Sequence, residues 1–160
     1  QIKTKLPDDA CSTVVFQKDW HKGVIGIVAS RLIETYYRPT VILTQSGDLL
    51  AGSARSVANF NLYEALEDCQ ADLIQFVGHP AAAGMTLAPE QLEGFKKAFE
   101  ASVAKRIKPH QKQLTLSYDL EVEASDLDAK FYRILQRFAP FGPGNMAPVL
   151  LCRGLLDNGS

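Results

Sequence analysis

Two glycines and several alanines surround one histidine, His79, in residues 76–85, and this small-residue stretch constrains the fold more than any other. A glycine inside a helix or strand costs about 0.5–1 kcal/mol relative to alanine, so glycine is kept where the backbone turns sharply or lies close to another group. A strand at residues 73–77 is followed directly by Gly78 and His79. This pattern predicts a ligand-binding site in which the ligand lies close to the backbone. The alternative is a helix packed closely on a sheet, with His79 as a structural histidine. The local pattern alone slightly favours this alternative.

The composition is that of an ordinary globular protein of 160 residues, with 46% hydrophobic and 22% charged residues. This length predicts one domain, or one domain and a piece of another. The net charge of −1 gives no general attraction for nucleic acid, so any polyanion site must be local. No apolar run approaches the roughly 20 residues that span a bilayer, so we expect no membrane partner. The chain begins at Gln1 without an initiator methionine, which we interpret as the mark of an excised fragment.

The three cysteines are far apart in the sequence and odd in number. They are Cys11, Cys69 and Cys152. This spacing matches neither a metal site nor a disulfide framework, and it favours a reducing, cytoplasmic environment.

Short β-branched runs alternate with helical patterns in the first two thirds of the chain. This predicts strands and helices that alternate along the chain. The helix that begins at Val24 would bury one face, with Ile27 among its buried residues, and would end before Pro39. A turn at residues 45–48 predicts a hairpin. The predicted strands are 12–16, 40–44, 49–53, 73–77 and 85–87. Asn61 and Glu64 match the spacing of a capping box, which predicts a helix at 62–69, and a long helix is predicted from residue 89 to about residue 107.

A polar break divides the chain into a domain at residues 1–108, a linker at 109–113 and a second unit at 114–160. In the second unit, alternation over residues 114–122 predicts a half-exposed strand. A helix at about residues 127–138, a rigid turn and a strand at residues 148–152 follow. These elements are too few for an independent domain, so we expect the second unit to be truncated.

No catalytic set can be assembled from the sequence. The three histidines are His21, His79 and His110. The sequence contains no HExxH or CxxC metal motif, no GxSxG nucleophile elbow and no GxxxxGK(S/T) P-loop. The carboxylates are scattered, whereas a two-metal hydrolase needs several of them close together. We therefore predict no catalytic residue and no metal ligand in this chain.

Two stretches are candidates for binding an anion. Arg55 lies between Ser53 and Ser56 in a glycine-led corner at a strand end, and an arginine can hold a phosphate with two parallel hydrogen bonds. Trp20 and His21 precede a predicted helix start, where backbone N–H groups favour anions. The alternatives are a solvated arginine in a loop and a tryptophan packed beneath a loop.

These stretches carry a resemblance to a known family. Residues 20–32, 52–56 and 76–84, in this order, resemble the RecJ family of single-strand-specific exonucleases in the DHH phosphoesterase superfamily. The third stretch resembles the Gly-Gly-His…Ala-Ala-Gly signature of the DHH-associated domain, although Val77 stands where the family has its first glycine. Residues 140–145 resemble a turn in the family's OB-fold domain.

The resemblance implies an α/β fold, with a mixed β-sheet flanked by helices in a DHH-associated substrate-binding domain. A truncated OB-fold-like segment would follow this domain. It places two Mn²⁺ or Mg²⁺ ions in an N-terminal catalytic domain that this chain lacks, and none in the chain itself. It implies that Trp20 and His21 face the cleft between the domains. The residues implied to contact the phosphate backbone or terminal nucleotide are Ser53, Arg55, Ser56, Gly78, His79 and Gly84.

We therefore expect the strand-binding portion of a 5′-to-3′ single-stranded-DNA exonuclease of DNA repair and recombination. Its partners would be single-stranded DNA and the missing catalytic domain. One alternative is a fragment of a DHH-family phosphodiesterase acting on short oligonucleotides or cyclic dinucleotides, against which the OB-like residues 114–153 weigh. Another is a non-catalytic tRNA-binding module like the C-terminal domain of alanyl-tRNA synthetase.

Overall fold

The computed structural model describes residues 9–156. Their contacts divide after residue 114 into two compact units. Each unit is described by itself.

The first unit is built on a five-stranded sheet in the order β1-β2-β3-β5-β4. Strand β1 runs parallel to β2, and every other neighbouring pair is antiparallel. The predicted mixed sheet is therefore confirmed. The predicted hairpin joins β2 to β3, and Gly47 adopts a left-handed φ of 63° in its turn, a conformation that favours glycine. The strands are β1 (Thr13–Phe16), β2 (Thr40–Ser46), β3 (Leu49–Arg55), β4 (Gln75–His79) and β5 (Ala82–Leu87).

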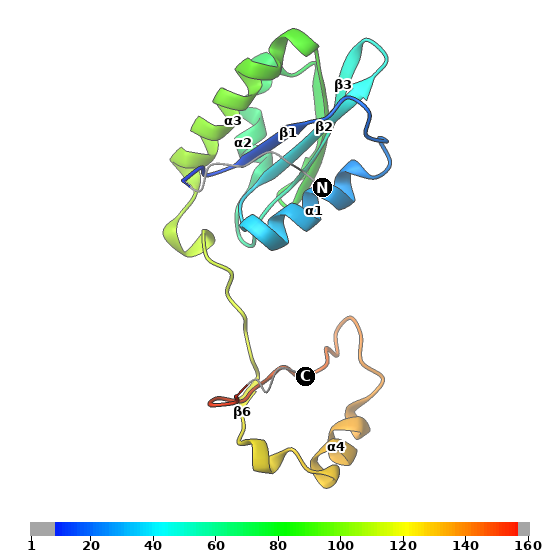
Figure 1. The fold of residues 1–160 in the computed structure, drawn as a ribbon, viewed down its shortest axis with the longest axis vertical. Helices are drawn as coiled ribbons and strands as arrows, with labels where there is room; N and C mark the ends of the chain where they lie inside the picture. The colour runs from blue at the N-terminus through cyan, green and yellow to red at the C-terminus, as the bar shows by residue number, and fades with distance from the viewer. Residues whose placement is uncertain (1–8, 157–160) are drawn as a thin grey trace. The chain divides into compact units, whose positions relative to one another are not determined.

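Three helices flank this sheet, and they cover its two faces unequally. Helices α2 (Leu62–Glu67) and α3 (Leu92–Arg106) lie on one face, and helix α1 (Ile25–Tyr36) lies on the other (Figure 1). The larger hydrophobic cluster lies between the sheet and α2 and α3, where Phe95 stacks on Phe99 with 5.7 Å between ring centroids. A smaller cluster lies beneath α1.

The helix ends follow local chemistry. Asn61 caps α2, because its side chain accepts the backbone N–H groups of Tyr63 and Glu64 and donates to the Glu64 carboxylate, as the sequence predicts. The prediction for the buried face of α1 is wrong in part, since Val24 and Ile27 are exposed. Residues 24–33 are nearly all apolar or small, so periodicity alone allowed several choices of buried helix face. In the structure, the face that packs on the sheet is that of Ile25, Ala29 and Leu32.

Strands β4 and β5 form a hairpin closed by the two-residue turn of Pro80 and Ala81. The small residues Ala82 and Gly84 therefore lie in a strand, and the alternative of a helix at this point is wrong. The predicted strand at residues 85–87 is too short, because alanine and glycine have low strand propensity. Pairing with β3 on one side and β4 on the other overrides that propensity.

The polar residues after α3 pack on the first unit. Pro109–Gln111 form one turn of 3-10 helix, and the Gln111 side chain is buried. Its amide nitrogen donates to the Asn59 carbonyl, and its oxygen accepts the Lys108 N–H at 2.8 Å.

The second unit holds a two-stranded parallel sheet and one α-helix. The strands are β6 (Leu120–Glu121) and β7 (Leu150–Leu151), and the helix is α4 (Ala129–Leu135). Asp128 caps α4 by accepting the Phe131 N–H at 2.7 Å. The predicted strand at residues 114–122 is confined to β6, because the alternating residues before it have no partner strand in the described part of the chain. The predicted helix at 127–138 is shortened to α4 and a 3-10 turn.

The stacked phenylalanines make the first unit sensitive to truncation at the core. We expect Phe99→Ala to lower the free energy of unfolding by about 3–5 kcal/mol, since the substitution removes a fully buried ring and leaves a cavity. Urea unfolding measures this change. Ile27→Ala is the control, because Ile27 is exposed on α1 and its loss should change stability by less than about 0.5 kcal/mol. Equal effects of the two substitutions would contradict this placement of the core.

A carboxylate network ties the end of α2 to the end of α3 and makes stability depend on pH. Hydrogen bonds from the Arg106 guanidinium and from the Ser102 hydroxyl hold the pKa of Asp68 below its ordinary value. A depressed folded pKa contributes stability above the unfolded pKa of about 3.9, and the contribution is lost as the pH falls through the folded pKa.

We therefore expect Asp68→Asn to be less stable than the parent at neutral pH. The difference should shrink as the pH falls below about 4, because the parent carboxylate is then protonated as well. Urea unfolding across the acid range measures it, with Asp48→Asn in the exposed β2–β3 turn as the matched control. A difference that stays constant through the acid range would count against the network.

Candidate nucleic-acid interface

The strand register brings several of the predicted site residues onto one face of the sheet. Residues directly opposite each other on neighbouring strands point to the same face. Ile42, which packs beneath α1, is opposite Ser53 on β3, so this face is the one that carries α1. Two rows of residues cross β3, β5 and β4 on it. The first is Arg55, Ala82 and His79, and the second is Ser53, Gly84 and Val77.

Helix α1 covers only part of this face. It packs on β2 and β3, whereas the residues of β4 on the same face are open to solvent. Val77 is 77% exposed, and His79 is exposed. On this face α1 therefore lies beside strands that it does not cover. We call the part of the face on β4 and β5 the open shelf. Its residues are Gln75, Val77, His79, Ala82, Gly84 and Thr86.

Arg55 lies where α1 meets the open shelf. Its Nη1 donates to Ser53 Oγ at 3.0 Å and to the Ala54 carbonyl at 2.8 Å. A Cβ on Gly26, in the first turn of α1, would lie 2.8 Å from Arg55 Nη2 and 3.2 Å from Ser53 Oγ. Glycine at this position thus makes room for the guanidinium beneath the helix start. The first backbone N–H groups of a helix have no partner within it, and Gly26 places this end of α1 next to the guanidinium.

His79 presents a hydrogen-bond donor at the edge of the open shelf. The Ala81 N–H donates to His79 Nδ1 at 3.3 Å. A neutral imidazole that accepts at Nδ1 carries its proton on Nε2. The Nε2–H group is then available to an acceptor such as a phosphate or sugar oxygen.

The other predicted phosphate-binding residues are placed differently. Ser56 follows β3, and its hydroxyl donates to the Phe60 carbonyl at 2.8 Å, which gives it a structural partner. Gly78 points to the face opposite the open shelf, where a Cβ would lie 2.6 Å from Ala83 Cβ. Its glycine is thus explained by close contact between strands. Gly84 lies on the open shelf, and a Cβ there would meet nothing closer than the Gly52 carbonyl oxygen at 4.0 Å.

Trp20 and His21 lie in the loop before α1. The Trp20 ring is half-buried against the small cluster beneath α1, and its carbonyl accepts the Thr44 hydroxyl at 2.6 Å. This packing is the structural alternative raised by the sequence. His21 is exposed, and its Nδ1 accepts the Gly23 N–H at 3.0 Å. A cleft role for the two residues stays a prediction.

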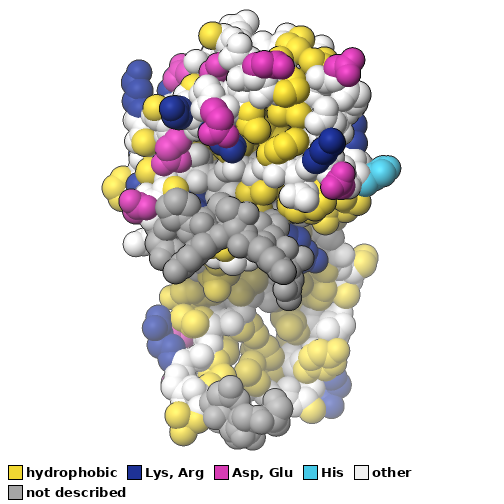
Figure 2. All heavy atoms as spheres, turned by 45° about the horizontal axis from the view of Figure 1, so that its top comes forward, with side chains coloured by type: hydrophobic (Ala, Val, Ile, Leu, Met, Phe, Trp, Pro, Cys, Tyr) yellow, Lys and Arg dark blue, Asp and Glu magenta, His cyan; other side chains and the backbone are white. Residues whose placement is uncertain are grey.

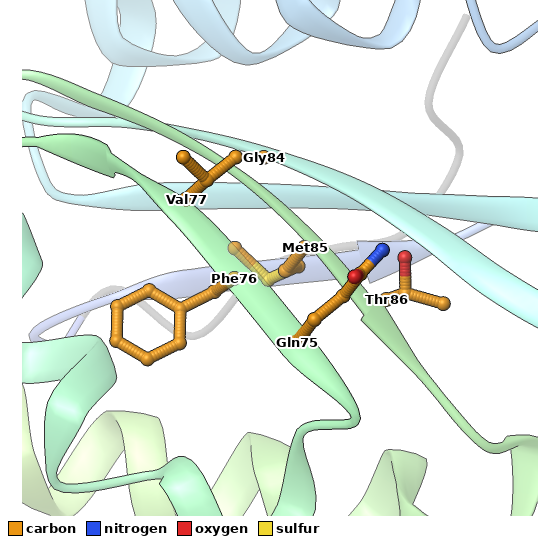
Figure 3. A pocket seen from close by; sticks show the side chains of 6 residues that line it. All are labelled: Gln75, Phe76, Val77, Gly84, Met85 and Thr86. Carbon is orange, nitrogen blue, oxygen red and sulfur yellow. The ribbon is translucent and has the colours of Figure 1, made fainter.

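Sequence reasoning missed a hollow of about 140 Å³ on the hairpin of β4 and β5. Figure 3 shows the six residues that line it. Gln75 and Thr86 were not selected from the sequence. Thr86 alternates with the buried Met85 and Leu87, as a residue on the outer face of a sheet does. The lining residues are Gln75, Phe76, Val77, Gly84, Met85 and Thr86.

Charge on the first unit is mixed. Figure 2 shows Lys and Arg side chains interspersed with Asp and Glu side chains on the face it presents. In the described chain, no group of three or more histidine, cysteine, aspartate or glutamate side chains could hold a metal ion. None of the helices from residue 9 to residue 156 has the length and hydropathy needed to span a bilayer. Phosphate binding would therefore depend on local donors such as Arg55 and His79.

Comparison with known proteins identifies the class to which this fold and shelf belong. Residues 9–105 match the family model of the DHHA1 domain, and the chain belongs to that family. Residues 118–158 match the model of the RecJ OB domain. The pair of domains in this order is that of the RecJ proteins that the resemblance indicated.

The curated relatives of this chain are also RecJ proteins. The chain is 33% identical over 145 residues to the single-stranded-DNA-specific exonuclease RecJ of Bacillus subtilis, covering 89% of this chain and 18% of the relative. It is 34% identical to RecJ of Thermus thermophilus, over 91% of this chain and 21% of the relative. The chain thus spans about a fifth of the length of these relatives.

Solved structures give the same result. The crystal structure of RecJ in complex with Mn²⁺ from Thermus thermophilus matches with a TM-score of 0.78 and 30% identity, over 91% of this chain and 21% of that one. The C-Ala domain of alanyl-tRNA synthetase from Aquifex aeolicus matches with a TM-score of 0.52 and 14% identity, over 60% of this chain and 93% of that one. The second likeness shows a shared fold alone.

Proposed function

We propose that this chain is the strand-binding portion of a RecJ-like, single-stranded-DNA-specific 5′-to-3′ exonuclease acting in cytoplasmic DNA repair and recombination. The observation that carries the proposal is the row of Arg55, Ala82 and His79, in which Arg55 beside the start of α1 and the exposed His79 lie on the same face of the sheet. The relatives named as single-stranded-DNA-specific exonucleases support it.

The open shelf would hold the backbone of the strand. Arg55 would neutralise a phosphate and donate to it, together with the free N–H groups of the first turn of α1. His79 would donate from Nε2 to a neighbouring phosphate or sugar oxygen. Each donor is set by a contact within the chain, Arg55 by Ser53 and His79 by the Ala81 N–H. Phosphate binding would therefore depend on a few local donors, which is consistent with a chain whose net charge is −1.

Hydrolysis is assigned to a separate catalytic domain. The solved relatives contain Mn²⁺ or Mg²⁺, but the described residues of this chain offer no matching ligand set. Two divalent ions bound in such a domain supply an activated water and stabilise charge on the phosphate. This chain would position the DNA strand and bind its phosphates.

The two alternatives are less well supported. A phosphodiesterase for short oligonucleotides or cyclic dinucleotides does not account for the match of residues 118–158 to the RecJ OB domain. The tRNA-binding alternative rests on a likeness at 14% identity, which concerns the fold alone.

Arg55 provides the direct test of phosphate binding. We expect Arg55→Ala to weaken binding of the chain to a fluorescent oligothymidylate. We also expect the slope of log affinity against log salt to become shallower by about 0.7, the amount lost with one single-strand phosphate contact. Fluorescence anisotropy across a salt series measures both quantities.

The matched control is Arg31→Ala. Arg31 is an exposed arginine on α1 that pairs with Glu34 at 2.8 Å, so its removal also costs one positive charge. It should leave the salt slope nearly unchanged. Equal changes from the two substitutions would show that Arg55 acts only through net charge and would contradict the contact.

The division of labour predicts that the 160-residue chain alone does not cleave DNA. Incubation of the purified chain with end-labelled single-stranded DNA and Mn²⁺ should leave the substrate intact. Robust, metal-dependent hydrolysis by the chain would refute the assignment of catalysis to another domain. Heat-denatured chain provides the background control.

A further inference from the structure

We propose that the hollow on the hairpin of β4 and β5 is a nucleobase subsite, with Val77 as the apolar surface on which the base lies. This inference rests on the proposed function and deepens it, because it assigns the part of the shelf next to the phosphate-binding row. Of the six residues that line the hollow, Val77, Gly84, Gln75 and Thr86 are the ones that lie on the open shelf.

The shape of the hollow suits a flat ring. Val77 projects from β4 onto the open shelf with 77% of its surface exposed, and Gly84 lies directly opposite it on β5. The space above Gly84 is open, since a Cβ there would meet no atom closer than 4.0 Å. Val77 is thus an apolar wall beside a bare backbone floor (Figure 3). A ring set against the wall would remove the valine from water, which is favourable in proportion to the apolar area buried.

Polar groups border the hollow on its far side. Gln75 and Thr86 are opposite each other in the register, and both lie on the open shelf. Neither side chain makes a hydrogen bond with another described residue. A glutamine amide offers both a donor and an acceptor, and a threonine hydroxyl can serve as either. The edge of any of the four bases can therefore find a partner here, and no charged side chain lines the hollow.

The arrangement of rows decides which part of the ligand occupies the hollow. The row of Arg55 and His79 comes first, the row of Val77 lies two residues along the strands, and the row of Gln75 lies two further. Two residues of strand span about 6.6–6.8 Å. Cationic and N–H donors thus flank an uncharged, partly apolar hollow. A nucleotide has the same arrangement, with its anionic phosphate on one side and its uncharged base on the other.

The test compares a base-bearing strand with a base-free one. Anisotropy measures the affinity of the full 160-residue chain for an oligothymidylate and for an abasic oligodeoxynucleotide of equal length and phosphate count. We expect the parent to prefer the oligothymidylate. We expect Val77→Ala to reduce that preference by about threefold to tenfold, as the loss of one to two buried methyl groups predicts.

Further variants separate this role from a structural one. Val77→Thr keeps the β-branched shape that suits a strand and should also reduce the preference, because it places a hydroxyl against the base. Ile74→Ala removes a different exposed apolar side chain, which precedes β4 and does not line the hollow, and should leave the preference unchanged. Arg55→Ala should weaken binding of both strands equally.

Each outcome decides a different claim. Equal affinity of the parent for the two strands, or a preference that survives both Val77 substitutions, overturns the nucleobase subsite and leaves the proposed function standing. Failure to bind either strand, or indifference to Arg55→Ala, overturns the proposed function and the subsite with it.

Discussion

The register of strand β3 between β2 and β5 is the constraint on which the rest of the structure depends. Side chains along a strand alternate between faces, so a slip of one residue would exchange the two faces. In the observed register Leu50 and Ala54 are buried in the core beneath α2 and α3, while Ser53 and Arg55 face α1. A slipped register would place the Arg55 guanidinium in that core without compensation, which is strongly unfavourable. Burial of the core thus fixes the orientation of the candidate site.

The unequal covering of the sheet leaves part of the α1 face exposed, and this exposed part is the candidate site. Helices α2 and α3 bury one face, whereas α1 packs on β2 and β3 on the other face and leaves the β4 residues there exposed. Gly26 lets α1 lie directly over Arg55, so one contact sets both the helix position and the guanidinium. The donors therefore lie on strands and at a helix start, which hold geometry better than a loop would.

Local patterns predicted much of this fold, and they failed where tertiary contacts override them. Asn61 and Glu64 marked the start of α2, and the turn at Gly47 marked the β2–β3 hairpin, because both signals lie within a few residues. The start of β5 was missed because alanine and glycine carry no strand signal of their own. Their pairing partners on β3 are distant in the sequence, so local patterns do not contain that information.

The site was accessible to sequence reasoning only in part. Arg55 and His79 stood out through their residue type and their glycine-rich surroundings, and the register places them in one row. Gly78 stood out for the same reason, yet its glycine is explained by contact with Ala83. Sequence cannot separate these cases, because both appear as a glycine beside a histidine. Val77 gains its meaning only from the face on which it lies.

The central claim is that single-stranded DNA binds on the open shelf of the sheet. The most direct measurement is a titration of the ¹⁵N-labelled chain with oligothymidylate, followed by amide chemical-shift changes. The account predicts that the shifts concentrate at Gly26, at Ser53 and Arg55, and along the hairpin from Gln75 to Thr86. Shifts confined to α2 and α3 on the opposite face, or to the second unit, would contradict it.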